Sequence, residues 1–159
     1  EIFIAEMGAK QEHDIQEICD LVHQKYGILT AIGEQHLETF KTLDNIKKTK
    51  FELIETLPHE GTAFLNKDDQ NIMSYAQRNK CRVIYYGIEA ADLHYRATDI
   101  SYSSKGSSFS VLKYDGTSVD RQSCSVVITS IIFLQPSQSA QRRGYRLRKS
   151  LVLLNRWLP

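Results

Sequence analysis

Long apolar runs and paired cysteines are both missing from this 159-residue chain. No run approaches the roughly 20 apolar residues that a membrane-spanning helix needs. No basic segment precedes a cleavable apolar stretch either, so we expect a cytoplasmic protein without a membrane span. The three cysteines, Cys19, Cys81 and Cys124, form an odd number without C-x-x-C spacing. This pattern argues against a disulfide framework and against a zinc site.

Acidic residues are missing from the last part of the chain. All 19 lie at or before Asp120, whereas residues 121–159 hold seven basic residues and no acid. Ordinary composition would place about five acids in such a stretch. The tail is therefore either a basic arm for nucleic acid or a membrane, or a segment outside its natural reading frame. Tyr145 and Trp157 are the aromatics near its basic residues, which is few for nucleic-acid binding, and we expect no specific nucleic-acid partner.

The phosphate-binding pattern G-x-x-x-x-G-K-[ST] is also absent, and Ser104-Lys105-Gly106-Ser107 does not replace it. What is present is an alternation of short apolar runs with segments of helical periodicity. The predicted strands are residues 2–5, 27–32, 62–65 and 81–87, and the predicted helices are residues 15–22 with Asp14 as N-cap, 43–57 and 68–79. This alternation predicts an α/β fold with a parallel sheet.

Residues 93–119 change character, with apolar residues alternating at a period of two and a turn dipeptide at Asp115-Gly116. They predict a small antiparallel β ribbon after the parallel sheet, and an irregular basic tail follows it.

Two candidate metal ligands follow predicted strands, where parallel sheets bind their ligands. Glu6 succeeds an apolar run, the position at which P-loop NTPases hold a metal-binding acid. A solvated acid at a strand end is the alternative. His36 follows Gly33, which permits a tight turn. Imidazole suits a divalent metal beside a carboxylate, although a lone histidine is also common on surfaces.

Lys50 is the third candidate. It shares a helical stripe with Ile46 and Leu53, which directs it toward the sheet. A buried lysine needs a partner or loses its charge. The alternative is that its ammonium group reaches solvent while its stem stays buried.

In this order and context, the candidates resemble the Mur ligases over roughly residues 1–115. The motifs are Glu6-Met7-Gly8-Ala9, Thr30-Ala31-Ile32-Gly33 leading to His36-Leu37-Glu38, Thr49-Lys50-Phe51-Glu52, and Leu65-Asn66-Lys67-Asp68-Asp69. The resemblance implies a partial P-loop-NTPase-like domain in which Glu6 and His36 ligate Mg²⁺. It implies that Lys50 is the family's carbamylated lysine, which helps to hold a second Mg²⁺, and that Asn66 lies near the adenine or ribose of ATP.

The resemblance is closest to the members that add D-Ala-D-Ala to UDP-MurNAc-tripeptide in peptidoglycan precursor synthesis, with ATP and Mg²⁺ as cofactors. Those members usually have Asn where Ala31 stands, Pro where Gln24 stands and Gly where His13 stands. The resemblance places the P-loop before Glu1, so we expect a fragment that is inactive alone.

The family continues with a Leu-Gly-x-His-Asn segment that is missing here. Reading residues 125–140 one nucleotide earlier permits Leu-Gly-Ser-His-Asn, so we hypothesise a frameshift near residues 115–123. The predicted organisation is therefore a partial Mur ligase central domain over residues 1–120 and an out-of-frame basic tail over residues 121–159. Two alternatives remain: a non-catalytic α/β module that binds a partner through the tail, and another ligase of the superfamily, of the folylpolyglutamate synthase type.

Overall fold

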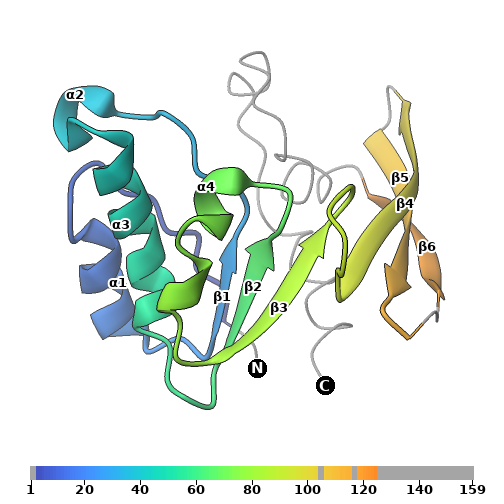
Figure 1. Ribbon diagram of the computed structural model, residues 1–159, viewed down its shortest axis with the longest axis horizontal. Coiled ribbons are helices and arrows are strands. Elements are labelled where there is room, and N and C mark those ends of the chain that lie inside the picture. Colours follow the sequence, from blue (N-terminus) through green and yellow to red (C-terminus); the bar gives the residue numbers. More distant parts are fainter. Residues whose placement is uncertain (1–2, 104–105, 116–117, 125–159) are drawn as a thin grey trace.

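One mixed six-stranded sheet organises the protein (Figure 1). The computed structural model describes residues 3–103, 106–115 and 118–124. The strands follow chain order across the sheet: β1 (Tyr26–Leu29), β2 (Thr62–Asn66), β3 (Arg82–Gly87), β4 (Tyr95–Ser103), β5 (Gly106–Lys113) and β6 (Ser118–Cys124). Strands β1 to β4 pair in parallel, and β4, β5 and β6 pair antiparallel. The sequence prediction of a parallel α/β sheet followed by an antiparallel ribbon is confirmed.

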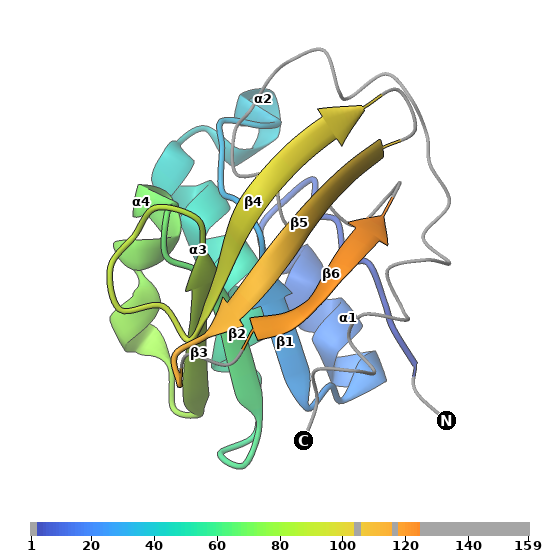
Figure 2. The ribbon, with the colours of Figure 1, turned by 90° about the vertical axis from the view of Figure 1, so that its right-hand side faces the viewer.

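The helices gather on one side of β1, β2 and β3, and the ribbon of β4 to β6 extends from the other end of the sheet (Figures 1 and 2). They are α1 (Asp14–Val22), α2 (Leu37–Phe40), α3 (Leu43–Glu55) and α4 (Gln70–Met73), with a 3-10 helix at Ala76–Arg78. In the described part of the chain, no helix is long and apolar enough to cross a membrane.

The main hydrophobic core lies between α1, α3 and the parallel strands. Helix α3 contributes Ile46, Phe51 and Ile54, which are at most 2% exposed. The central strand β2 contributes Ala63 and Leu65, which are fully buried. A second, smaller cluster in the ribbon contains Ala97, Phe109 and Val111. The apolar stripe that predicted the helix over 43–57 is thus the face that α3 buries.

The strand predicted at residues 2–5 is wrong where the structure describes it, because residues 3–9 have no regular secondary structure. A strand needs a neighbour to satisfy its backbone N–H and C=O groups. In the described sheet, β1 pairs with β2 alone. Apolar composition predicted a buried strand but could not supply the pairing partner.

Two predicted helical features also differ. The helix predicted over residues 68–79 is broken after Met73, where the backbone tightens so that Tyr75 N–H donates to the Ile72 carbonyl. The Tyr75 ring packs 5.5 Å from that of Phe51. Asp14 is not the N-cap of α1, because His13 holds that position. The residues of the predicted tail from 125 onward lie outside the described residues.

Candidate functional site

The carboxyl end of β1 is held by side chains from neighbouring strands. The Tyr86 hydroxyl on β3 donates to the Leu29 carbonyl at 3.0 Å. The Asn66 side-chain amide at the end of β2 donates to the Thr30 carbonyl at 2.9 Å, and its oxygen accepts from Asp68 N–H at 3.0 Å. Burial raises the pKa of Tyr86 far above its ordinary value, so this hydroxyl keeps its proton. These contacts end the β1 pairing earlier than the predicted residue 32.

Asp69 and Asn71, which we call the Ile32 clamp, hold the next residues of the same loop. Asp69 Oδ2 accepts from Ile32 N–H at 2.9 Å, and Asn71 Nδ2 donates to the Ile32 carbonyl at 2.7 Å. The other Asp69 oxygen accepts from Ile72 N–H at 2.9 Å and so caps α4. The loop that leads to His36 therefore starts from a fixed backbone position.

The loop after β3 is held by residues that follow β2 and by Arg96. The Asp68 carboxylate accepts from the backbone N–H groups of residues 88–90, with Ala90 N–H at 2.7 Å. Arg96 donates to the Ile88 and Ala90 carbonyls, and Lys67 Nζ donates to the Ala91 carbonyl at 2.7 Å. A Cβ at Gly87 would lie 2.7 Å from Asp68 Oδ2, so glycine permits this close approach.

Sequence reasoning missed these holding roles. It assigned Asn66 a place near ATP and gave no role to Asp68, Asp69 or Asn71. The available signal was an Asn-x-Asp-Asp run directly after a buried strand, since Asp and Asn side chains readily bond to nearby backbone groups.

The three candidate metal ligands lie on three separate segments. Glu6 is exposed in the irregular segment before α1. His36 precedes α2 with φ 53°, and its side chain is 49% exposed with Nδ1 3.5 Å from Glu38 Oε1. Lys50 on α3 is partly buried. Burial lowers the pKa of Lys50, and the negative charge of Glu6 opposes this shift.

The structure thus brings Glu6 and Lys50 within electrostatic range of each other. Among the described residues, no group of three or more His, Cys, Asp or Glu side chains lies close enough together to hold a metal ion. The negative charge of Glu6 supplies the nearby acid that a partly buried, cationic Lys50 needs.

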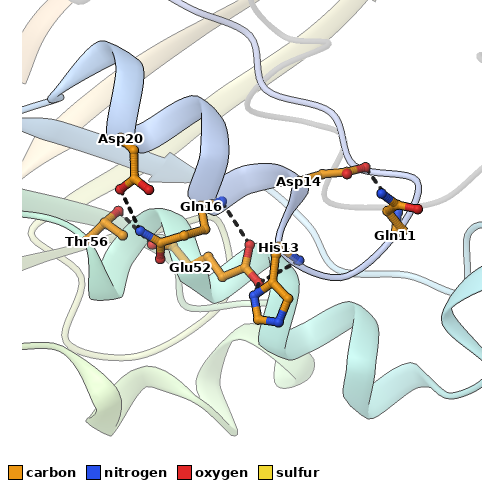
Figure 3. A network of polar contacts seen from close by, with 7 residues as sticks. All are labelled: Gln11, His13, Asp14, Gln16, Asp20, Glu52 and Thr56. Atoms are coloured by element: carbon orange, nitrogen blue, oxygen red, sulfur yellow. Dashed lines mark hydrogen bonds and ion pairs between the residues drawn. The ribbon is translucent and has the colours of Figure 1, made fainter.

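A polar network joins α1 to α3 (Figure 3). The carboxylate of Glu52 on α3 accepts from His13 N–H at 3.1 Å and from Gln16 N–H at 3.0 Å. These N–H groups lie at the N-cap and in the first turn of α1, have no partner within the helix, and favour a nearby negative charge. Glu52 therefore caps α1 from another helix. Asp14 instead accepts from Lys10 and Gln11 N–H, which closes the turn before α1.

This architecture is that of an α/β domain with a mostly parallel sheet, a class in which ligands bind at loops that follow the carboxyl ends of the strands. Comparison with known proteins then places it more closely. Residues 1–128 match the model of the Mur ligase middle domain, so the chain belongs to the Mur ligase family. The family resemblance seen in the motifs is confirmed.

Relatives of known function and structure agree with this family. The UDP-N-acetylmuramate–L-alanine ligase of Clostridium acetobutylicum is 30% identical over 114 residues, which cover 67% of this chain and 24% of that protein. The structure of the MurF ligase of Thermotoga maritima with ADP has a TM-score of 0.60 and 24% identity, covering 71% of this chain and 26% of that one. A MurF structure from Acinetobacter baumannii has a TM-score of 0.64 and 19% identity, covering 80% and 27%. The chain spans about a quarter of the length of such relatives.

Proposed function

We propose that this chain is a piece of an ATP-dependent amide-bond ligase of peptidoglycan precursor synthesis. The observation that supports this most is a partly buried lysine near an acid, in a chain that matches the Mur ligase middle domain. A carboxylate is a poor electrophile, so ATP converts it into an acyl phosphate and the incoming amine displaces phosphate. Such a transfer needs cations to neutralise the charge on the phosphoryl group.

In this proposal, Glu6 and His36 ligate Mg²⁺, and carbamylated Lys50 helps to hold a second Mg²⁺. Lys50 suits that role because its lowered pKa leaves more of the amine neutral. A neutral amine adds to CO₂, forming an N–C bond and releasing one proton, which converts the uncharged amine into a carbamate that carries a carboxylate. Carboxylate oxygens are hard ligands that Mg²⁺ prefers, and Mg²⁺ usually keeps several waters, so few protein ligands suffice.

Asn66 is the proposed nucleotide-side residue. Its side chain already donates to the Thr30 carbonyl and accepts from Asp68 N–H. An amide has a second N–H and a second lone pair. Because Asn66 is only 1% exposed, contact of these remaining groups with adenine or ribose would require the surrounding loop to move.

For the substrates, we propose that the parent ligase adds D-Ala-D-Ala to UDP-MurNAc-tripeptide. The Glu6-Met7-Gly8-Ala9 motif supports this, and the MurF structures share the fold. Addition of L-alanine is the second candidate, because the Clostridium acetobutylicum relative that is 30% identical carries that name. Assaying the longer protein for ATP hydrolysis stimulated by either amine separates the two.

The site proposal is tested by ¹³C NMR of the full chain in ¹³C-bicarbonate. We expect a carbamate signal that Lys50→Met removes and that Lys41→Met, at an exposed position, leaves unchanged. A signal that Lys50→Met does not affect would overturn the role of Lys50. Because G-x-x-x-x-G-K-[ST] is absent from the sequence, we expect no ligation by this chain alone.

We also propose that residues 1–120 are the partial central domain and that residues 121–159 are out of frame. Strand β6, Ser118–Cys124, crosses this boundary, and the family match runs to residue 128. The gene sequence tests the proposal, because codons that do not permit Leu-Gly-Ser-His-Asn in the shifted frame contradict it.

A further inference from the structure

The proposed metal ligands lie on three separate segments of the chain. Two further side chains connect these segments. Glu6 lies in the irregular segment that leads to α1, His36 lies in the turn before α2, and Lys50 lies on α3. The connecting residues are Thr39 on α2 and Glu52 on α3. Both contact backbone between residues 10 and 16, which directly follows the Glu6 segment.

Thr39 joins the His36 turn to the Glu6 segment. Its hydroxyl lies 2.5 Å from the Lys10 carbonyl and 3.0 Å from the His36 carbonyl. A hydroxyl has one hydrogen to donate, and of its two carbonyl partners Lys10 is the one outside the local turn. This bond spans 29 positions of sequence, so it fixes tertiary structure, not only the local turn.

Glu52 joins the Lys50 helix to the start of α1, which follows the Glu6 segment. Its carboxylate accepts from His13 and Gln16 N–H, as Figure 3 shows, and its side chain is 12% exposed. Residues two apart on a helix do not face each other. Glu52 can therefore hold α1 while Lys50, two positions earlier, remains available to the Glu6 side.

We propose that Thr39 and Glu52 are positioning residues that set the geometry of the metal site. This inference rests on the proposed function. Residues 3–9 have no strand or helix to fix them, so the packing of Met7 and Ala9 into the core and the tertiary bonds just beyond the segment together hold Glu6 relative to Lys50 and His36. Groups that orient metal ligands typically change metal affinity 10- to 100-fold when they are lost. Thr39 and Glu52 act through the backbone, so we expect the lower end, about tenfold.

The test measures Mn²⁺ binding by electron paramagnetic resonance, with Mn²⁺ as the probe, on the full chain in bicarbonate. Wild type is expected to bind, and Glu6→Gln to bind much more weakly. Thr39→Val removes the hydroxyl and is expected to raise Kd about tenfold, whereas Thr39→Ser restores the hydroxyl and the affinity. Glu52→Gln is expected to raise Kd similarly. Its matched control is Glu55→Gln on the same helix, where a 43% exposed carboxylate 3.8 Å from Arg78 is removed.

Circular dichroism first establishes a temperature at which each variant is fully folded. A role limited to stability would then leave Kd unchanged. Wild-type affinity in both Thr39→Val and Glu52→Gln, with loss in Glu6→Gln, would overturn the inference and leave the proposed function intact. No binding by wild type, or no effect of Glu6→Gln, would overturn both. If Glu52→Gln does not fold, the comparison of Val with Ser at Thr39 decides.

Discussion

Replacing Asp69 with alanine should destabilise the fold substantially, because this carboxylate serves two backbone donors at once. One oxygen caps α4 through Ile72 N–H, and the other accepts from Ile32 N–H. Loss of a helix cap costs about 1 kcal/mol. Ile32 is 2% exposed, so its N–H would lose its acceptor away from water, at about 1–3 kcal/mol. The expected total is about 2–4 kcal/mol.

Urea denaturation followed by far-ultraviolet circular dichroism measures this loss. Asp69→Ser separates the two parts, because serine caps helices nearly as well as aspartate but has one short hydroxyl in place of two oxygens. It should recover about 1 kcal/mol of the loss. A cost below about 0.5 kcal/mol for Asp69→Ala, which is typical of featureless surface positions, would refute the role of the Ile32 clamp in holding the loop after β1.

Three further changes test other parts of the same sheet edge. Gly87→Ala should cost about 1–3 kcal/mol, because its Cβ would meet the anchored Asp68 carboxylate at 2.7 Å; Gly27→Ala, which meets flexible side chains at 3.2 Å or more, should cost less in the same urea assay. Tyr86→Phe should cost about 1 kcal/mol by removing one buried hydrogen bond to β1, and an unchanged urea midpoint would contradict this. Burial lowers the pKa of Lys50 below 10.5, so the unfolded chain binds that proton at pH values where the folded chain has released it. Stability relative to Lys50→Met should therefore rise with pH in the range just below 10.5, and a constant difference would contradict the shift.

The sequence predicted those elements whose determinants are local. Helix α3 has an apolar stripe and a proline at position 58, and β2 is a short apolar run before a polar loop. The elements that were predicted wrongly depend on partners that are distant in the sequence. The segment before α1 is apolar yet unpaired, and the capping rule chose Asp14 where a carboxylate 36 positions away along the chain from Gln16 does the capping. A local sequence pattern does not show which distant residue will be the bonding partner.

The candidate site shows the same division. Predicted strand ends and a helical stripe singled out Glu6, His36 and Lys50, and the family resemblance gave them their roles. The structure adds that the charge of Glu6 acts on Lys50. The resemblance gave Asn66 a role beside ATP, whereas its visible contacts are to backbone. A motif records which residue type is needed at a position. It does not tell whether that side chain contacts the substrate or holds in place a loop that contacts the substrate.

The run of residues 66–69 has a structural logic that follows from the position of β2 between β1 and β3. Asn66 and Asp69 bond to the chain leaving β1, while Lys67 and Asp68 bond to the loop leaving β3. One short loop after the central strand therefore fixes the exits of both neighbours. Ligand-bearing loops have little regular structure to keep them in place. Anchoring them to a single central loop couples their positions, so a substitution here should disturb the loop that leads to His36 and the loop after β3 together, whereas Thr39→Val should disturb only the contact between the His36 turn and Lys10.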